Sequence, residues 1–354
     1  MKTVRTFARQ FSSLILAMTL GSAVVSCDSI LDEEDVDCSV EYRVKFKYDY
    51  NMKYADAFAN EVSSVTLYAF DDNGKLAFQK TEEGDLIKQD GYRMRLDAIS
   101  HSKKGEYDFI AWAGEPDNES FTIPLLTVGK STKEDLYCQL NRKHESRADE
   151  GMAVVETDLD ALFHGQVNNL SFGRSVAVGE DVVVPLVKNT NVIRIILQHL
   201  SGEPVNVDNF TFTITDENGL MNYDNSLLKD EVITYRAWNK EDGYAGLGEQ
   251  VEKVEGVTEI NVAIAELTTA RLMADQRPVL TIRNIEKDET VLSIPLVDYA
   301  LLVKGQYNRS MDSQEYLDRQ DEYALTFFLD EGNQWMNAFI YINSWRIVLQ
   351  NSEL

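Results

Sequence analysis

The chain has three cysteines, Cys27, Cys38 and Cys138, and their side chains carry the most distinctive chemistry in the sequence. A cysteine thiolate is a nucleophile that can take up an acyl group, bind a metal or form a disulfide with a second cysteine. No two of the three cysteines stand at the close spacing of a zinc site. Acylation and disulfide formation are therefore the two reactions that these residues suggest.

Residues 1–26 have the layout of a secretory signal peptide. Lys2, Arg5 and Arg9 form a basic start, and an apolar stretch of 15 residues, Phe11–Val25, follows. At about 1.5 Å per residue this stretch is about 22 Å long as a helix, which is shorter than a hydrocarbon core of about 30 Å. We therefore predict that this segment is an export signal that is removed.

Small residues precede the first cysteine, in the order Val24-Val25-Ser26-Cys27, and this run resembles the lipobox of bacterial lipoproteins. The resemblance implies that the Cys27 thiol carries acyl chains such as palmitate and that the chain is cut directly before it. Val24 stands where the lipobox prefers leucine. The alternative is an ordinary signal peptide cut nearby, with Cys27 as an incidental thiol. Because each buried CH₂ contributes about 0.8 kcal/mol, several acyl chains would hold the protein on the membrane effectively permanently.

An acidic run follows Cys27, and such a run cannot bury itself. Its carboxylates belong to Asp28, Asp32, Glu33, Glu34, Asp35 and Asp37. Residues 27–40 are therefore predicted to be a solvated tether. Acid placed directly after a lipidated cysteine also resembles the surface-export signal of Bacteroidetes lipoproteins. That resemblance implies a lipid-anchored protein on the outer face of the outer membrane.

The remaining cysteines, Cys38 and Cys138, form an even pair on an oxidising export route if Cys27 is lipidated. A disulfide between them would tie the end of the tether to the first domain. The alternative is two unpaired thiols, with Cys138 half-buried in a strand-like segment. The spacing of the residues does not decide between the two.

The chain is strongly acidic, with 34 Lys and Arg against 59 Asp and Glu and a formal net charge of −25. Removal of residues 1–26 takes away three basic residues and no acidic ones, which leaves 31 against 59, a net charge of −28. No basic stripe is present that could displace counterions from phosphates, so nucleic acid is not expected as a partner. The charge favours a colloidally stable exterior and carries no information about the fold.

No catalytic motif is present in the sequence. The four histidines are widely separated and form no His-Glu-x-x-His motif. They are His101, His144, His164 and His199. A Gly-x-Ser-x-Gly elbow, a phosphate-binding loop and a dinucleotide fingerprint are also absent, and a glycosidase pair cannot be recognised among 59 acidic residues by counting. We therefore expect a protein that is not an enzyme and that uses no cofactor and no metal.

Segments after the tether alternate between apolar and polar residues, which is the period of half-buried β-strands. The clearest are Tyr42–Tyr50, Val62–Phe70 and Gly105–Gly114. Helical candidates are few and short, the best being Asn51–Asn60 and Asp158–Phe163. The elements therefore predict an all-β fold.

The two halves of the chain share a segment at an offset of 145 residues, because Val62–Phe78 aligns with Val207–Tyr223 without a gap. The matched turn residues are Asp71, Asn73 and Gly74 in the first copy and Asp216, Asn218 and Gly219 in the second. Asn-Gly between two alternating runs predicts a β-hairpin with a type I′ turn, in which both central residues have positive φ. We therefore expect the same hairpin once in each half. A calcium loop is not supported, since neither copy has the alternating acids and distant glutamate of an EF-hand.

Two halves built from short strands predict two β-sandwich domains in series. The predicted bounds are 41–175 for the N-terminal domain and 180–354 for the C-terminal domain. The seam between them is expected in Ser171–Asp181, which is rich in glycine and polar residues.

Several motifs occur in an order that resembles the FimB/Mfa2 family of fimbrial anchor lipoproteins of Bacteroidales. After the lipobox come Tyr48–Phe58, Gly105–Gly114, Leu162–Gln166, Val184–Leu197 and Ile342–Leu354. Each motif is weak alone, and their order is the specific feature. The similarity spans essentially the whole chain that follows the signal peptide.

The resemblance implies two transthyretin-like, Greek-key β-sandwich domains and a position at the base of a surface fimbria, where the anchor ends the polymer and limits its length. Related stalk and tip subunits lose an N-terminal strand, and a strand from a neighbouring subunit fills the groove. An anchor carries its lipid at the N-terminus, so we expect it to keep its first strand and only to donate one. The expected partner is the major stalk subunit.

The candidate donor is the C-terminal segment, because β-augmentation needs an extended strand with alternating side chains. Its apolar side chains are Phe339, Ile340, Tyr341, Ile342, Trp345, Ile347 and Leu349. The alternative is a last strand of the protein's own second sandwich, with Trp345 in the core. Both interpretations hold if the strand belongs to the protein's own sandwich before assembly and leaves it during assembly. Two other functions also stay open, a surface glycan-binding lipoprotein and a tip adhesin of the same family.

Overall fold

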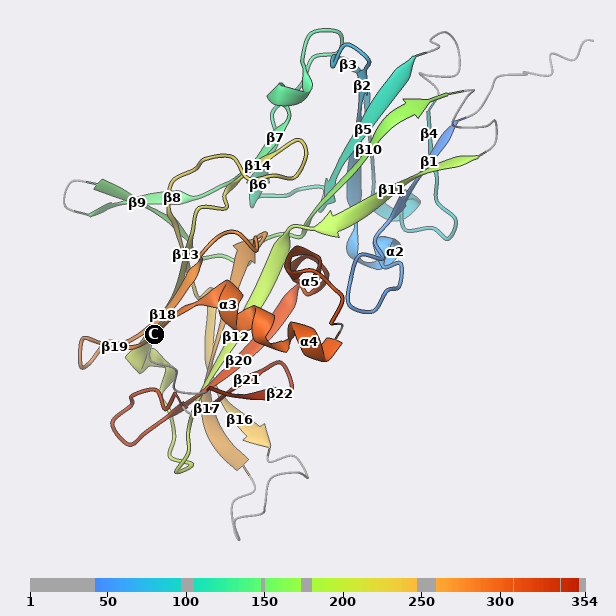
Figure 1. Ribbon diagram of the computed structural model, residues 1–354. Helices are drawn as coiled ribbons and strands as arrows, with labels where there is room; N and C mark the ends of the chain where they lie inside the picture. The colour runs from blue at the N-terminus through green and yellow to red at the C-terminus, as the bar shows by residue number, and fades with distance from the viewer. Residues whose placement is uncertain are drawn as a thin grey trace, which may run out of the picture. The chain divides into compact units, whose positions relative to one another are not determined.

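The computed structural model describes residues 42–96, 105–147, 150–172, 180–246, 259–307, 309–337 and 339–349. The signal segment, Cys27, the acidic run and Cys38 lie outside these ranges. Most of the described elements are β-strands arranged in several sheets (Figure 1), which confirms the predicted all-β sandwich class. Within the described ranges, none of the helices is both long enough and apolar enough to cross a membrane.

A seven-stranded sheet in the order β3-β2-β5-β10-β11-β1-β4 contains most strands of the first half. Its strands are β1 (Arg43–Lys47), β2 (Ser64–Asp71), β3 (Leu76–Glu83), β4 (Met94–Arg95), β5 (Glu106–Gly114), β10 (Leu162–Ser171) and β11 (Asp181–Lys188). Neighbouring strands are antiparallel except β1 and β11, which are parallel. Strand β1 shows the alternation expected from its sequence, because Val44 and Phe46 are buried and the residues between them are half-buried.

Two six-stranded sheets form most of the second half, in the orders β16-β17-β12-β20-β21-β22 and β19-β18-β13-β15-β9-β8. The first contains β12 (Thr190–His199), β16 (Asn239–Gly246), β17 (Glu259–Ala270), β20 (Glu322–Leu329), β21 (Phe339–Ile342) and β22 (Trp345–Val348). The second contains β8 (Lys143–Arg147), β9 (Glu150–Val155), β13 (Phe210–Asp216), β15 (Ile233–Arg236), β18 (Val279–Asn284) and β19 (Glu289–Pro295). Apolar residues of both sheets belong to one continuous core.

Strands cross the predicted seam in both directions. Strand β11 comes after the seam but pairs within the first-half sheet, whereas β8 and β9 come before the seam and pair within a second-half sheet. A small third sheet also joins the halves, with β14 (Leu220–Asn222) beside β7 (Tyr137–Leu140) and β6 (Phe121–Thr122). The division into 41–175 and 180–354 stays a prediction.

The helices are short, and in the described residues three of the four α-helices lie within residues 296–319. They are α2 (Phe58–Glu61), α3 (Leu296–Ala300), α4 (Lys304–Tyr307) and α5 (Ser313–Arg319), with one-turn 3₁₀ helices at 84–86, 133–135, 207–209 and 301–303. Of the predicted Asn51–Asn60 helix only the end is helical, and Asp158–Phe163 is not helical. Helix α5 begins after Asp312, whose carboxylate accepts a hydrogen bond from the Glu315 backbone N–H at 2.7 Å.

The first copy of the repeated segment forms the predicted hairpin, β2-β3, with a different turn. Gly74 has a φ of +70°, but Asn73 has no positive φ, so the turn is not type I′. The Asp71 carboxylate accepts hydrogen bonds from the backbone N–H groups of Asn73 and Lys75, at 2.9 and 3.0 Å. These bonds set the turn through the aspartate side chain.

The second copy does not form a hairpin, and that prediction is wrong. Strand β13 is followed by β14, which pairs with β7 in another sheet. The buried Asn218 amide donates to the Ala270 and Arg271 carbonyl oxygens, both at 3.1 Å, and its oxygen accepts from the Tyr235 hydroxyl at 2.6 Å. These three bonds join the Asn218 amide to groups in the core. Asn218 is therefore held in the interior and does not form a hairpin turn.

Gly165 shows why one glycine of the Leu162–Gln166 motif is required. It lies on β10 where β11 approaches closely, and a Cβ at this position would meet the Pro185 carbonyl oxygen at 2.5 Å. No side chain larger than hydrogen fits unless the two strands separate.

Candidate assembly site

The predicted cysteine sites divide between described and undescribed residues. Cys27 and Cys38 lie outside the described ranges, so lipidation and the disulfide stay predictions. Cys138 lies in β7 and is fully buried, opposite Met221 of β14. The expectation of a half-buried thiol is therefore wrong, because the sequence did not reveal the β7-β14 pairing. Burial raises the pKa of the Cys138 thiol, which disfavours the reactive thiolate.

The predicted strand-exchange segment forms a hairpin, β21-β22, at the end of the protein's own six-stranded sheet. Ile340 and Ile342 of β21 are fully buried. Ile347 and Leu349 are half-buried and pack against the same core. The alternative, a last strand of the protein's own second sandwich, is therefore confirmed for this structure, but Trp345 is 40% exposed and is not a core residue. The segment therefore has a buried first strand and a largely exposed second strand.

The hairpin is attached to its sheet by a short ladder. Strand β21 pairs with β20 only at Ile342 opposite Leu325 and at Tyr341 opposite Thr326. Two further bonds join Asn343 to Ala324, a backbone N–H donating at 2.7 Å and a side-chain oxygen accepting at 2.9 Å. On its other side β20 pairs with β12 over all eight of its residues. The hairpin is therefore the weakly paired end of this sheet.

Strand β22 is the last strand of the sheet and, among the described strands, has a free edge. In an antiparallel pair, every second residue directs its backbone N–H and C=O away from the partner strand. The side chains along this edge include Trp345 and Val348, and Val348 is 62% exposed. An exposed edge strand with apolar side chains is a template for another strand.

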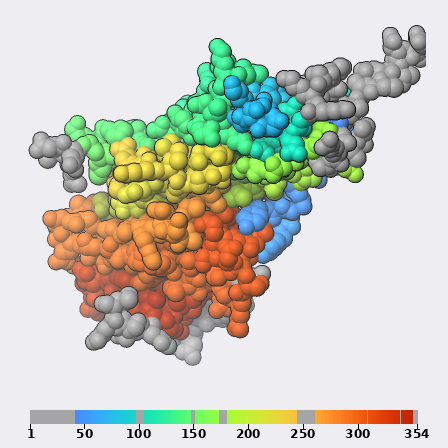
Figure 2. All heavy atoms as spheres, turned by 45° about the horizontal axis from the view of Figure 1, so that its top comes forward, coloured from blue at the N-terminus to red at the C-terminus, as the bar shows by residue number. Residues whose placement is uncertain are grey.

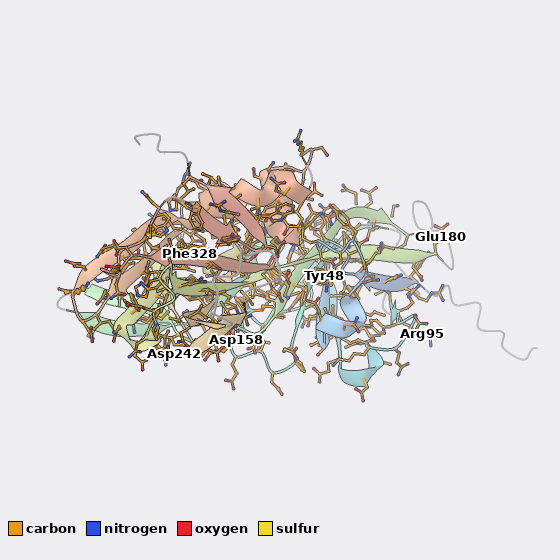
Figure 3. The ribbon with its side chains drawn as sticks, turned by 90° about the horizontal axis from the view of Figure 1, so that it is seen from below. Tyr48, Arg95, Asp158, Glu180, Asp242 and Phe328 are labelled. Carbon is orange, nitrogen blue, oxygen red and sulfur yellow. The ribbon has the colours of Figure 1, made fainter. Side chains whose placement is uncertain are left out.

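An aromatic cluster covers the face of the sheet beside this edge. The Phe328 ring centre lies 4.8 Å from that of Phe339 and 5.9 Å from that of Tyr341. The Arg346 guanidinium lies over the Phe339 ring, 4.6 Å from its centre. Figure 3 labels Phe328 among the strands of this sheet. The cluster links β20, β21 and β22 through side chains where the backbone ladder is short.

The first strand is held differently from the last. Strand β1 pairs with β11 over five residues, and only the two-residue β4 lies outside it among the described strands. Its own side chains Val44 and Phe46 are buried, and so is Tyr48, which directly follows the strand region. Arg43 of β1 also forms an ion pair with Asp181 of β11 at 3.2 Å. Strand β1 is therefore an integral part of the core.

Helix α5 contacts the segment that follows β1, and we name this contact the α5 joint. The Arg319 guanidinium lies 4.0 Å from the ring centre of Tyr50 and 4.5 Å from that of Tyr54. It donates hydrogen bonds to the carbonyl oxygens of Asp49 and Asn51, and the Arg319 carbonyl accepts from the Met52 N–H at 3.1 Å. Figure 2 shows blue atoms of this early segment against orange atoms of the last third of the chain.

A buried ion pair supports the α5 joint from inside. The Asp318 carboxylate accepts two hydrogen bonds from Arg271, both at 2.8 Å, and a third from Gln314. Arg271 also donates to the Asn225 carbonyl oxygen at 2.7 Å. A bidentate arginine-carboxylate pair fixes both side chains in one geometry. It therefore holds α5 against the loop that contains Asn225.

A second ion cluster joins the same regions through Lys188 at the end of β11. Its ammonium group lies 2.8 Å from the Asp321 carboxylate and 3.0 Å from that of Glu61. Burial alone would lower the pKa of Lys188, but the two carboxylates outweigh it and raise the pKa. The amine therefore stays charged and ties α2, β11 and the start of β20 together.

The His164 side chain is packed in the interior. Its ring lies 4.7 Å from the Trp112 ring, and its Nε2 is hydrogen-bonded to the Tyr223 carbonyl oxygen at 2.8 Å. Burial lowers the pKa of His164 to about 4, so the ring is neutral at ordinary pH. Within the described residues, no group of three metal-binding side chains could hold a metal ion.

Sequence reasoning did not find the α5 joint. Arg319, Asp318 and Arg271 lie far from Tyr50 along the chain, and no short motif connects them. The only signal was the aromatic Tyr48–Phe58 segment, which entered through the family resemblance. The Arg271 pairing could not be found without the fold, because 59 carboxylates offer too many partners.

Comparisons with known proteins agree with this geometry. The family model described as fimbrillin-A associated anchor proteins Mfa1 and Mfa2 matches residues 34–351. A solved structure of a proposed adhesin from Bacteroides thetaiotaomicron is 34% identical, with a TM-score of 0.76, and the match covers 89% of this chain and 100% of that one. A proposed polysaccharide-binding protein from the same species is 31% identical, with a TM-score of 0.71 and coverage of 88% and 98%.

The fimbrial anchor protein Mfa2 from Porphyromonas gingivalis shares the fold at lower identity. It is 17% identical, with a TM-score of 0.60, and the match covers 87% of this chain and 98% of that one. Among curated proteins, none matches this chain.

Proposed function

The chain belongs to the family of fimbrillin-A associated anchor proteins, and from this membership we propose that it anchors a surface fimbria at its base as a lipoprotein of the outer membrane. The family gives the protein a fimbrial, adhesin-related role at the cell surface and an association with fimbrial subunits. It is a family of structural proteins, not of enzymes. In the proposal, lipid on Cys27 holds the protein, and a stalk subunit is its direct partner.

The observation that carries the proposal is the difference between the first strand and the last hairpin. Strand β1 has a ladder of five residues and a buried side, whereas β21 has a ladder of two residues and leads into the exposed β22. A protein tethered at its N-terminus must keep β1 in place. The hairpin is the part that can leave its sheet and complete the sheet of a stalk subunit.

The energetic demand on such an exchange can be estimated from burial. Exposing Ile340 and Ile342 costs about 1.5–3 kcal/mol for each side chain. A stalk groove that buries the same two side chains and pairs their backbone would offset this cost. Trp345 and Val348, which are exposed in the free protein, would add new burial on binding. This new burial would drive the exchange, and the polymer would end there because the anchor keeps its own first strand.

A disulfide that locks the hairpin tests the proposal. Thr326→Cys with Tyr341→Cys would link β20 to β21 at a directly paired position. With the disulfide formed, we expect fimbriae to be released into the medium or to grow overlong. Reduction should restore attachment, because it frees the hairpin again. Fimbriae on cells and in the medium would be counted by electron microscopy and immunoblotting.

The matched control is a lock in a hairpin that is not expected to move, Thr66→Cys with Thr81→Cys across β2 and β3. Fimbriae should be normal with this lock. Normal fimbriae with the β20-β21 disulfide fully formed would disprove exchange of the hairpin. The lipid part is tested separately by Cys27→Ala, which should release the protein from the membrane. A Cys27→Ala protein that stays membrane-bound would disprove anchoring through this residue.

A further inference from the structure

The two six-stranded sheets of the second half differ on the faces that point away from their common core. Directly paired residues of neighbouring strands point to the same side of a sheet. On the sheet with β13 and β18, one such row on the outer face is entirely polar. It consists of Ser293, Thr281, Thr213 and Arg236. On the sheet with β12 and β17, a row on the outer face is mostly apolar. It consists of Ile264, Ile196, Thr326 and Tyr341.

The apolar row is unusual because it lies outside the described core. The alternate residues of the same strands, among them Ile195, belong to that core, whereas Ile196 and Ile264 do not and are half-buried. Phe328 lies on the same outer face one row further on, opposite Gln198. An antiparallel sheet with one solvated face normally carries polar residues on that face, and a contiguous apolar surface marks an interaction site. We name the surface formed by Ile196, Ile264 and Phe328 the outer apolar face.

Departure of the hairpin would enlarge this face. Phe328 stays on β20, which pairs with β12 over all eight of its residues. Its side chain is 7% exposed, and the rings of Phe339 and Tyr341 that contact it belong to the hairpin. Without the hairpin, the Phe328 ring would be exposed one row away from Ile196 on the same face. Apolar surface of this kind is unfavourable in water, so the exchanged state needs a cover over it.

The short chain before the hairpin fixes where the stalk subunit lies. The Trp335 ring centre is 5.7 Å from that of Phe327. The Met336 N–H donates to the Phe328 carbonyl oxygen at 2.8 Å, so the chain is held against β20 up to Met336. Phe339, the first residue of β21, follows three residues later, and three residues span at most about 10 Å. A subunit that takes up β21 must therefore lie directly beside β20 and Phe328.

The surroundings of the outer apolar face favour a partner subunit over a second copy of this chain. Two copies would bring together chains that each carry a formal net charge of −25, which opposes their association. Polar groups border the apolar row, since the next row contains the ion pair of Arg194 and Glu266. An apolar centre with a polar rim is the usual composition of a binding interface.

We propose that the outer apolar face is a second contact surface for the stalk subunit that takes up the hairpin, an inference that rests on the proposed function. The stalk subunit presents aliphatic or aromatic side chains beside its strand-accepting groove, and these cover Phe328, Ile196 and Ile264. Backbone hydrogen bonds of an added strand give affinity, whereas side-chain contacts on a shaped surface discriminate between partners. The outer apolar face therefore helps to select which subunit receives the hairpin.

Binding to anchor-free fimbriae tests the proposal. Fimbriae sheared from cells that lack this protein would be sedimented with the labelled mature protein in detergent. Ile264→Lys and Ile196→Lys should each weaken binding about tenfold, because the ammonium group would be buried against the stalk subunit. The matched control is Thr281→Lys, which adds the same charge to the polar face of the other sheet and should stay within about twofold of the unchanged protein. Thermal melts identify any variant that fails to fold, and Ile264→Thr replaces such a variant.

Two further measurements separate this proposal from the exchange itself. The disulfide between Thr326→Cys and Tyr341→Cys should abolish stable binding until it is reduced. Binding by the locked protein would overturn the exchange and this proposal together. If the lock blocks binding but both lysine variants of the outer apolar face bind as tightly as Thr281→Lys, only this proposal is overturned. A photo-crosslinking residue in place of Ile264 should link to a stalk subunit, and links only to a second copy or within the same chain would also overturn it.

Discussion

The Arg319 guanidinium lies 4.0 Å from the centre of the Tyr50 ring and so connects the last helix with the segment that directly follows the first strand. Strand β20, which carries the C-terminal hairpin, begins three residues after Arg319. The segment after the first strand and the strand that carries the hairpin are therefore both attached to helix α5. A rigid support at this place agrees with the proposed function, in which the protein is tethered through its N-terminus and bound through its C-terminal hairpin.

Removal of the Arg319 side chain should loosen the α5 joint. Arg319→Ala loses two cation-π contacts and two hydrogen bonds to carbonyl oxygens, so we expect the free energy of unfolding to fall by about 2 kcal/mol. Arg319→Lys keeps the charge but loses the planar fork, and its stability should fall between those of the unchanged protein and Arg319→Ala. Urea denaturation measures the change, and hydrogen exchange should increase in residues 48–57.

The control for this prediction is Arg277→Ala, which removes an exposed arginine paired with Asp298. Such a pair contributes about 0–1 kcal/mol, so the free energy of unfolding should hardly change. Equal effects of Arg319→Ala and Arg277→Ala would show that the α5 joint adds no stability.

Loss of Asp318 should have a larger effect than loss of Arg319. Asp318→Ala leaves the buried Arg271 guanidinium without its carboxylate, which typically costs about 3–5 kcal/mol. The double variant Arg271→Met with Asp318→Leu should regain part of this loss, because no unpaired charge remains. Both would be measured by urea denaturation. A double variant less stable than Asp318→Ala would contradict the explanation.

His164 should make stability depend on pH. Burial lowers its pKa from 6.5 to about 4, so between these values the unfolded chain binds more protons than the folded one. The contribution is complete above pH 6.5 and is lost as the pH falls to about 4, with a total of about 3 kcal/mol. His164→Gln, which can still donate to the Tyr223 carbonyl, should show a shallower fall of unfolding free energy over this range.

Asp216 acts in the opposite direction and has to be separated from His164. Burial raises its pKa to about 6, so its contribution increases as the pH falls through that value. It is unchanged in His164→Gln, and the difference between the two proteins therefore isolates the histidine. Identical pH profiles for the two proteins would rule out His164 as the source.

Gly165→Ala should destabilise the fold because β10 and β11 are too close for a Cβ. We expect a loss of about 1–3 kcal/mol, the usual cost of overpacking. The control is Gly305→Ala in α4, where a Cβ would meet no atom within 4 Å. That variant should gain about 0.5–1 kcal/mol. Thermal melts would rank the two, and a stabilising Gly165→Ala would contradict the packing described for this site.

Local patterns in the sequence predicted the individual strands but not all of their partners. The alternation in β1 was enough to place this strand, because burial on one face follows from period two. Strand β5 was also predicted, but its residues from Phe109 to Gly114 are buried on both faces. The aligned segments place Asn73 and Asn218 at matching positions, but only the segment with Asn73 forms a hairpin turn. A short motif cannot show that the Asn218 amide is used inside the core, since its partners at 270 and 271 are distant in the chain.

The helices and the candidate site show the same limit. Helices α3 to α5 are too short for a clear period of 3.6, and tertiary contacts decide their formation. The apolar composition of residues 339–349 predicted a strand, but not that Ile340 would be buried and Trp345 exposed. That difference depends on which strand lies at the edge, which is a property of the whole sheet.

The seclusion of Cys138 gives the protein a natural reporter of its internal motion. A thiol reagent can reach this sulfur only during moments when β7 and β14 part, so the labelling rate would record how often the interior opens. Fimbriated cells and isolated protein could then be compared by their labelling rates, and under the proposed function a bound stalk subunit should slow the labelling.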